Sequence, residues 1–312
     1  MILEVLRGAG IGRHLLDVDA LSRAEIEGVL ALAVEMREAR SAGTHRSLLE
    51  AQTVGLAFYE ASTRTRVSFE LAAKALGATV VDLNVTSSSV GKGESLIDTL
   101  RTLERTGVTA LVLRHAAAGA PYVAARGTGM AVVNAGDGVH AHPTQALLDA
   151  LTLFEALGPL DGRVITIVGD VAHSRVARSN LHSLVALGAR VRLGGPAAWV
   201  SGFEGYPGVE VAANIHDTLE GADAVMALRV QVERSAMGAI GSLREYVTRW
   251  RLDEARMEVA APNAPILHPG PTNEGVELTG ELANGRRSLI SRQVQNGVPV
   301  RMAVLALVTG AA

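Results

Sequence analysis

Apolar and amphipathic segments alternate along most of the chain, and this alternation predicts strands separated by helices. TVGLAF (53–58) is a short apolar run of strand length. The segment that follows it places Val67, Leu71 and Ala75 at helical spacing. The alternation continues through predicted strands at 78–83, 109–114 and 130–136 and predicted helices at 95–107, 120–127 and 143–158.

The pattern restarts after residue 161 and predicts a second sheet. Two such sets indicate an α/β chain of two domains, each a parallel sheet flanked by helices, with a hinge near residue 143. The second set comprises predicted strands at 162–170, 189–195, 209–215, 222–230 and 265–271, a helix at 175–188 and a last helix at 298–310.

Composition narrows the class of protein. The chain has 312 residues, 48% of them hydrophobic, and a net charge of −3, which favours a soluble protein and argues against general nucleic-acid binding. Cysteine is absent, which excludes disulfides and thiolate metal sites and fits a reducing compartment. The N-terminal stretch lacks a signal-peptide core, and no apolar run reaches the length of a membrane span. We therefore expect a cytoplasmic protein.

A run of hydroxyls and arginines, Ser62-Thr63-Arg64-Thr65-Arg66, lies where a predicted strand becomes a helix. Ligands of parallel sheets bind beyond the carboxyl ends of the strands. A helix N-terminus there offers N–H groups and a positive dipole end, and hydroxyls and arginine suit a phosphate. The alternative is that Ser62 only caps the helix and the arginines are solvated. Two cations at a helix N-terminus oppose its dipole, however, which favours a bound anion; for Arg66 a carboxylate such as Glu60 or Glu70 is the alternative partner.

Polar residues also follow other predicted strands. His142 and Gln145 begin the helix at 143–158, where the dipole disfavours a protonated imidazole and leaves a neutral one that donates one hydrogen bond. His140 is read as structural, and without a carboxylate partner set no metal site is expected. The other candidates are Lys92 in a Ser- and Gly-rich loop, Arg114-His115, and Arg175, Arg178 and Arg229 after strands of the second sheet. For Lys92 and Arg178, a solvated side chain is the alternative.

Together these motifs closely resemble the catalytic chains of the aspartate transcarbamoylase family. The resemblance runs in order along the chain through STRTR (62–66), the lysine loop, RH (114–115), HPTQ (142–145), the arginine after GDVAHS (169–174), LRVQ (228–231) and HPGP (268–271). It implies transfer of the carbamoyl group of carbamoyl phosphate to the amine of L-aspartate, giving N-carbamoyl-L-aspartate and phosphate, an early step of pyrimidine biosynthesis. It also implies a homotrimer whose active sites lie between domains and at subunit interfaces.

The resemblance further implies a role for each candidate residue. The implied domains are a carbamoyl phosphate-binding domain, 1–143 plus a C-terminal helix at 292–312, and an L-aspartate-binding domain, 144–291. The implied carbamoyl phosphate site comprises Ser62, Thr63, Arg64, Thr65, Arg114, His142, Gln145, Gly270 and Pro271. The implied L-aspartate site comprises Arg175, Arg229, Gln231 and Lys92, with Lys92 and Ser89 supplied by a neighbouring subunit.

The chemistry of the residues agrees with these roles. Attack of an amine on a carbamoyl carbon needs positioned anions, exclusion of water and donors for an oxyanion, so neither metal, cofactor nor covalent nucleophile is expected. Thr65, Arg114 and His142 are the candidate oxyanion donors, and Arg64 completes the catalytic set.

Two alternatives and two departures accompany this interpretation. Ornithine transcarbamoylases share STRTR but usually carry an SMG stretch and a cysteine in HCLP, whereas this chain has LRVQ and HPGP, and arginine favours a substrate carboxylate. A non-catalytic phosphate-binding module fits the full cationic set less well. The lysine loop leaves open whether Ser88 or Ser89 matches the family's loop serine, and Glu274 stands where many relatives have arginine. The resemblance raises a regulatory chain or a dihydroorotase-like partner; no nucleic-acid or membrane partner is expected.

Overall fold

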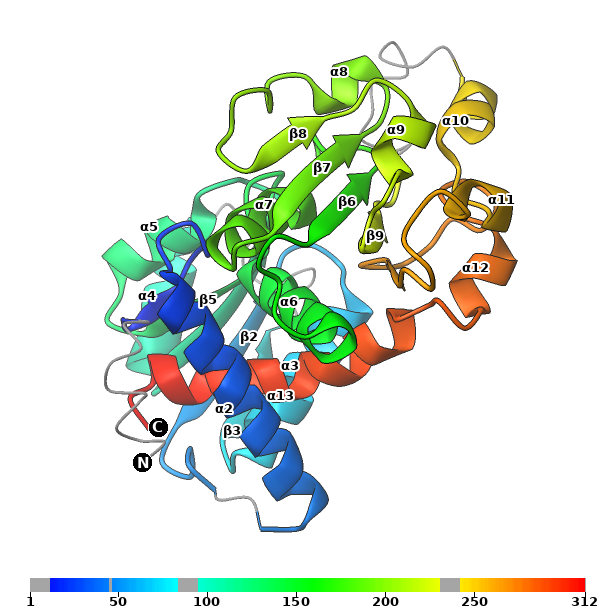
Figure 1. Cartoon of the computed structure of the whole chain (residues 1–312). Coiled ribbons are helices and arrows are strands. Elements are labelled where there is room, and N and C mark those ends of the chain that lie inside the picture. Colours follow the sequence, from blue (N-terminus) through cyan, green and yellow to red (C-terminus); the bar gives the residue numbers. More distant parts are fainter. Residues whose placement is uncertain (1–11, 45–46, 84–94, 231–241, 312) are drawn as a thin grey trace. The chain divides into compact units, whose positions relative to one another are not determined.

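Two parallel sheets organise the chain in the computed structural model, which describes residues 12–44, 47–83, 95–230 and 242–311 (Figure 1). Within these residues each sheet has five parallel strands, in the orders β1-β5-β4-β2-β3 and β10-β9-β6-β7-β8. The chain forms two compact units, Met1–Leu148 with Val294–Ala312 (unit 1) and Asp149–Gln293 (unit 2). The predicted α/β class with two parallel sheets is confirmed.

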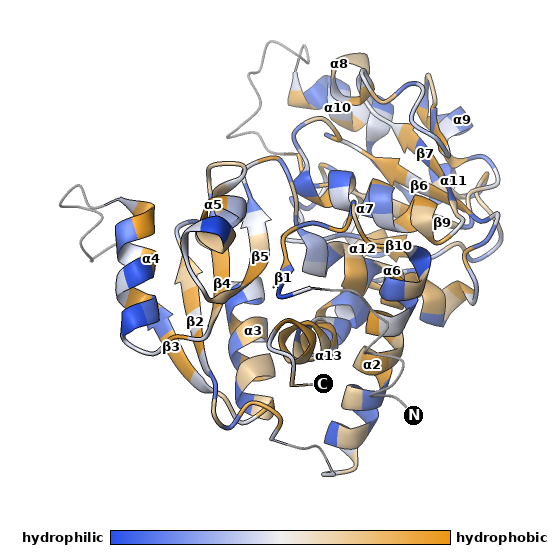
Figure 2. Ribbon diagram, turned by 90° about the vertical axis from the view of Figure 1, so that its left-hand side faces the viewer, coloured by the Kyte–Doolittle hydropathy of each residue, from blue (hydrophilic) through white to orange (hydrophobic). Residues whose placement is uncertain are grey.

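Unit 1 contains the first sheet. Its strands are β1 (His14–Leu15), β2 (Thr53–Phe58), β3 (Thr79–Leu83), β4 (Ala110–His115) and β5 (Ala131–Asp137). Its helices are α2 (Arg23–Ser41), α3 (Thr63–Ala75), α4 (Leu96–Arg105) and α5 (Ala120–Gly127), while α6 (Pro143–Leu157) and α13 (Ile290–Val308) each cross from one unit to the other. Leu56, Leu111 and Val132 on the central strands are fully buried. Figure 2 shows these strands mainly in the hydrophobic colour and α4 with alternating bands, as expected for an amphipathic helix on an apolar sheet.

Unit 2 contains the second sheet. Its strands are β6 (Val164–Val168), β7 (Arg190–Gly194), β8 (Val209–Val211), β9 (Ala224–Ala227) and β10 (Ile266–Leu267). Its helices are α7 (Arg175–Ala186), α8 (Ala197–Val200), α9 (Ile215–Leu219), α10 (Leu243–Trp250), α11 (Glu254–Met257) and α12 (Gly280–Asn284). The core beside β9 includes Trp199 and Tyr246, whose ring centroids lie 5.5 Å apart.

Three predicted elements differ from the structure. The strand expected at 209–215 ends at Val211, because Asn214 caps the short helix α9. The strand expected at 265–271 is reduced to Ile266–Leu267, since the prolines that follow cannot extend a ladder. The helix expected at 298–310 begins at Ile290 and contains Pro299.

Helix α2 was not predicted, although its start carries a recognisable signal. The Glu25 N–H donates to the Ser22 hydroxyl (3.3 Å), and the Ser22 N–H donates to the Glu25 carboxylate (2.6 Å). This is a capping box, and the sequence Ser22-Arg-Ala-Glu25 is its signature. Across the described ranges, no helix combines the length and the apolar character that crossing a membrane requires.

Candidate active site

The Ser62–Arg66 turn joins β2 to α3, as the hydrophobic pattern predicts. Ser62 occupies the N-cap position with extended backbone, yet its side chain makes no capping hydrogen bond, and the first turn of α3 holds no acidic residue. Thr63 and Arg64 are exposed, whereas Thr65 is buried at 6% exposure. The reading of Ser62 as a simple cap is therefore wrong, and this helix start presents its hydroxyls and Arg64 without a neutralising carboxylate in its own first turn.

Arg66 has a partner of its own. Its guanidinium forms an ion pair with Asp82 on β3, rather than with either of the two carboxylates suggested from the sequence. Glu70 instead accepts from Lys74 at 2.7 Å. Arg66 therefore ties α3 to the edge strand β3, which accounts for one of the two arginines at this helix start.

Arg114 lies at the end of β4, next to the end of β2. The Phe58–Arg114 register and the hydrogen bond from Tyr59 N–H to the Arg114 carbonyl (2.9 Å) fix its backbone. Its Nη1 donates to the Ala135 carbonyl at 3.3 Å, and its Nη2 lies 3.9 Å from Glu60 Oε1. The guanidinium is thus held among the carboxyl ends of three adjacent strands, β2, β4 and β5.

A buried carboxylate fixes the loop between β5 and α6. Asp137 has no exposed surface and accepts from the backbone N–H groups of Gly119 (2.7 Å) and Ala141 (3.0 Å) and from Asn134 Nδ2 (2.8 Å). The loop leads directly into His142 and Gln145, which are 4% and 8% exposed at the start of α6. The position of the His142 backbone is therefore set by Asp137.

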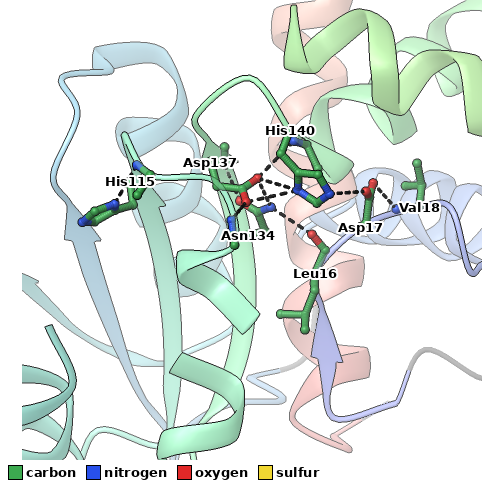
Figure 3. Close-up of polar contacts among 11 residues, drawn as sticks. Leu16, Asp17, Val18, His115, Asn134, Asp137 and His140 are labelled. Atoms are coloured by element: carbon green, nitrogen blue, oxygen red, sulfur yellow. Dashed lines mark hydrogen bonds and ion pairs between the residues drawn. The ribbon is translucent and has the colours of Figure 1, made fainter. Parts of the chain in front are cut away.

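His140 joins this loop to the N-terminal segment. Its Nδ1 lies 3.1 Å from Asp137 Oδ2, and its Nε2 lies 3.6 Å from Asp17 Oδ2 (Figure 3). Asn134 Nδ2 also donates to the Leu16 carbonyl at 2.9 Å. The interpretation of His140 as a structural histidine agrees with these contacts. Within the described ranges, no three His, Asp or Glu side chains gather as a metal site.

In unit 2, Arg175 begins α7 just beyond β6. Ser174 caps the helix by accepting from Ala177 N–H at 3.1 Å, and Arg175 is 8% exposed. The preceding turn is fixed by fully buried Asp170, which lies 2.7 Å from His173 Nδ1.

Arg178, one helical turn further along α7, has a structural setting. Its Nη2 donates to the Ala172 carbonyl at 3.1 Å, and its guanidinium lies 5.5 Å from the centre of the Phe203 ring. Arg178 is therefore held by contacts within unit 2 and is not a simply solvated side chain.

Arg229 follows β9, and the residue after it is held by a second buried carboxylate that the sequence interpretation missed. Glu277 is 1% exposed and accepts from Val230 N–H (2.7 Å), Asn273 N–H (2.9 Å) and Asn273 Nδ2 (2.7 Å). Burial raises the pKa of Glu277, while these hydrogen bonds oppose the rise. The one available signal is an acid between Val276 and Leu278 in a short apolar stretch.

The HPGP turn (268–271) follows β10. His268 is 1% exposed, and its Nδ1 accepts from Gly270 N–H at 2.8 Å. Gly270 has a φ of 66°, a left-handed conformation that glycine adopts without strain, and the Gly270–Pro271 peptide is cis. The turn is therefore closed by its own first side chain.

The structure gathers the predicted residues in two sets, each at the carboxyl edge of one sheet. Unit 1 carries Ser62, Thr63, Arg64, Thr65, Arg114, His142 and Gln145 after β2, β4 and β5. Unit 2 carries Arg175, Arg229, Gly270 and Pro271 after β6, β9 and β10. The predicted Ser88, Ser89, Lys92 and Gln231 lie outside the described residues. Apart from Gly270 and Pro271, which offer backbone carbonyls, both sets consist mainly of hydrogen-bond donors and cations, which is the chemistry of anion binding.

One parallel sheet that leads into a hydroxyl–arginine helix start, and a second sheet that leads to Arg175 and Arg229, define a binder of small anionic substrates. Two family profiles match: aspartate/ornithine carbamoyltransferase, carbamoyl-P binding domain, over residues 13–155, and the Asp/Orn binding domain over residues 161–308. The chain belongs to the aspartate/ornithine carbamoyltransferase family.

Relatives of known name favour the aspartate branch. The aspartate carbamoyltransferase catalytic subunit of Thermus aquaticus is 51% identical over 94% of this chain and 97% of its own length. That of Gluconobacter oxydans is 50% identical over 95% of both.

Among the solved structures, sequence identity distinguishes the aspartate enzymes from the ornithine enzymes, whereas similarity of fold does not. Aspartate transcarbamoylase from Trypanosoma cruzi, in complex with N-(phosphonacetyl)-L-aspartic acid, has a TM-score of 0.85 and 31% identity, covering 94% of this chain and 95% of that one. Ornithine carbamoyltransferase from Pyrococcus furiosus has a TM-score of 0.88 but 26% identity, covering 96% and 97%. Because the ornithine enzyme fits the fold at least as well, the substrate branch rests on sequence.

Proposed function

We infer that the chain is an aspartate carbamoyltransferase, which transfers the carbamoyl group of carbamoyl phosphate to the amine of L-aspartate. The observation that carries this conclusion is the uncapped Ser62–Thr65 helix start, beside Arg114, in a chain that is half identical to named aspartate carbamoyltransferase catalytic subunits over nearly its full length. The products are N-carbamoyl-L-aspartate and phosphate, and the step belongs to pyrimidine biosynthesis.

Aspartate rather than ornithine is the acceptor that fits unit 2. L-Aspartate brings two carboxylates, and Arg175 and Arg229 supply two guanidinium groups, with Gln231 and Lys92 completing the proposed set. A cationic ornithine side chain would meet like charge there. The identity of about 50% to aspartate enzymes, against 26% to the Pyrococcus ornithine enzyme, supports the same choice.

The proposed reaction uses positioning and electrostatics. The aspartate amine forms a bond to the carbamoyl carbon, negative charge develops on the carbonyl oxygen, and the bond to the phosphate oxygen breaks so that phosphate leaves with the electron pair. The amine proton leaves with or through that phosphate. Each step needs fixed donors more than a covalent intermediate.

Residue roles follow from this sequence of bonds. Ser62, Thr63 and Arg64 bind the phosphate group, and Thr65, Arg114 and His142 donate to the developing oxyanion. Gln145 and the backbone carbonyls of Gly270 and Pro271 bind the carbamoyl amide end. Unit 1 with its carbamoyl-P profile is therefore the proposed carbamoyl phosphate domain, and unit 2 the proposed L-aspartate domain.

A homotrimer with shared active sites is part of the proposal. Lys92 and Ser89 are proposed to act in a neighbouring subunit's site. Val67 and Leu71 on α3 and Val81 on the edge strand β3 are 39%, 45% and 38% exposed, and exposed apolar side chains of this kind suit a subunit contact. A cytoplasmic location, and a regulatory or dihydroorotase-like partner, are further proposals.

One assay tests the function. Purified chain should release phosphate and form carbamoyl aspartate only when carbamoyl phosphate and L-aspartate are both present. A parallel assay with L-ornithine should give no carbamoylated product. Turnover of ornithine without turnover of aspartate would contradict the acceptor, and no turnover with either would favour a non-catalytic binding protein.

A further inference from the structure

A chain of buried hydrogen bonds runs through unit 2 to the HPGP turn. Asn180 Nδ2 on α7 donates to Asp149 Oδ2 on α6 at 2.9 Å, and Gln293 Nε2 on α13 donates to Asp149 Oδ1 at 2.7 Å. The backbone N–H of His268 then donates to Gln293 Oε1 at 2.9 Å. Asp149 and Asn180 have no exposed surface, and Gln293 is 3% exposed.

The ends of this chain fix which way each amide points. Gln293 meets a carboxylate with its nitrogen and a backbone N–H with its oxygen, so only one orientation of its amide satisfies both neighbours. Asn180 is fixed in the same way, because its Nδ2 also donates to the Val176 carbonyl at 3.0 Å. Asp149 therefore orients Gln293, and Gln293 holds the first residue of the turn.

The turn depends on that first residue. His268 Nδ1 accepts from Gly270 N–H, so a His268 backbone held in place also fixes Gly270 and the peptide to Pro271. An imidazole that accepts at Nδ1 is neutral and carries its proton on Nε2. The carbonyls of Gly270 and Pro271 are thus positioned through His268 by Gln293, which contributes no atom to the turn itself.

We propose that Gln293, oriented by Asp149, is a positioning residue for the carbamoyl end of carbamoyl phosphate. The proposal rests on the proposed function, since it takes the HPGP turn as the carbamoyl-binding element. Its consequence is selective: loss of the Gln293 contact weakens binding of the carbamoyl group and leaves the phosphate group, held by the Ser62–Thr65 turn in unit 1, bound as before.

Reversing the polarity of the pair tests this directly. Gln293→Glu brings two carboxylates together where 2.7 Å now separates an amide nitrogen from an oxygen. In Asp149→Asn, only one side-chain oxygen remains to accept from both Asn180 Nδ2 and Gln293 Nε2. Rotating the Asn180 amide would remove this conflict, but Asn180 Nδ2 would then lose its hydrogen bond to the Val176 carbonyl. The double variant restores every contact, because the amide introduced at position 149 donates to the carboxylate introduced at position 293 and accepts from Asn180. That carboxylate still accepts from the His268 N–H.

The measured quantity is the preference for carbamoyl phosphate over inorganic phosphate. It is the ratio of the inhibition constant of phosphate, measured against carbamoyl phosphate, to the KM for carbamoyl phosphate at saturating L-aspartate. Gln293→Glu should lower this ratio by about tenfold or more, Asp149→Asn by less, and the double variant should recover most of the loss. The phosphate constant should change by less than about twofold in all three.

A matched control lies one helical turn further along α13. Asn296 has no exposed surface and accepts from Arg37 Nη1 at 3.0 Å, in unit 1. Gln293→Leu takes the place of Gln293→Glu if the latter does not fold. Asn296→Leu should lower stability about as much as Gln293→Leu does, but it should leave the ratio of the phosphate inhibition constant to the KM unchanged.

The outcomes separate the two proposals. A wild-type chain that forms no carbamoyl aspartate refutes the proposed function. An active wild type overturns the positioning role if the Gln293 variants keep the wild-type ratio, if phosphate and carbamoyl phosphate weaken equally, or if the double variant is no better than Gln293→Glu.

Discussion

Replacing Glu277 by alanine removes the acceptor for two loops at once. The carboxylate accepts from Val230 N–H, next to Arg229, and from Asn273 N–H, two residues beyond Pro271. Both loops carry residues of the proposed substrate set. Glu277→Ala should therefore weaken the fold locally and raise the KM for L-aspartate, because Arg229 loses the fixed backbone beside it.

The expected loss of stability is about 2–4 kcal/mol. Two backbone N–H groups lose their acceptor at a cost of ~1–3 kcal/mol each, and relief from burying a charge offsets part of that cost. The Asn273 side chain keeps a second acceptor, the Val230 carbonyl at 3.1 Å, so its loss adds little.

The stability that Glu277 contributes changes with pH in a direction that its pKa shift determines. Burial raises the folded-state pKa of Glu277 above its ordinary 4.5, so between pH 4.5 and the folded-state pKa the folded state retains a proton that the unfolded state has lost. Stability contributed by this group is present below 4.5 and decreases as pH rises through the folded-state pKa. Since alanine does not titrate, the stability gap between wild type and Glu277→Ala should narrow from pH 5 to pH 8.

Urea unfolding at equal protein concentration measures both the loss of stability and its dependence on pH. Glu274→Ala is the control. Glu274 is exposed three residues away, so its replacement should change stability by less than about 0.5 kcal/mol. A Glu277→Ala chain as stable as wild type at pH 5, or a gap that widens toward pH 8, would refute the reasoning.

Three further predictions concern the Ser62 turn and its surroundings. Arg64→Ala should lower kcat/KM by roughly a hundredfold or more and shift stability by less than about 0.5 kcal/mol, since Arg64 is exposed; equal loss of activity and melting temperature would indicate a structural role. Mixing inactive Arg64→Ala chains with inactive Lys92→Ala chains should restore some carbamoyl aspartate formation in hybrids, and verified hybrids without activity would argue for self-contained sites. Arg66→Ala should cost at most about 1 kcal/mol in thermal unfolding, because the side chains of Arg66 and Asp82 are 40% and 41% exposed; a much larger loss would mean a role beyond this ion pair.

Strongly patterned elements could be predicted from the sequence. The apolar run at 53–58 forms β2 with the expected bounds, and the helix expected at 143–158 is found at Pro143–Leu157. The start of α13 was missed because the pattern there is weak for a physical reason, whereas α2 was missed despite its capping box. The first two turns of α13 read as polar because Gln293 and Asn296 are buried through hydrogen bonds rather than through apolar contact.

In the candidate site, too, some residues could be recognised from the sequence and others could not. Residues proposed to face a ligand lie at or after the ends of strands and are recognisable by their charge, as Arg64 and Arg114 are. The residues that hold them are not, because their partners are distant in sequence: Glu277 accepts from Val230, 47 residues away, and Gln293 accepts from His268, 25 residues away. No local pattern encodes such contacts.

In both sheets, a buried carboxylate accepts hydrogen bonds from the backbone of the loops that follow the strands. A loop beyond a strand loses the ladder that would satisfy its backbone N–H groups, and a buried N–H without an acceptor is costly. Asp137 meets this need for Gly119 and Ala141, and Glu277 meets it for Val230 and Asn273. One carboxylate accepts several such bonds, so each acid fixes a loop that a single neutral side chain could fix only in part. Within the described residues, the donors to these two acids are N–H groups of the backbone, of amide side chains and of one imidazole, and such dipoles stabilise a buried carboxylate. The proposed role of the guanidinium groups of Arg64, Arg114, Arg175 and Arg229 is with the substrate anions. Transfer of a carbamoyl group between two anions requires donors fixed where charge develops, and loops held by buried carboxylates suit the proposed donors to that task.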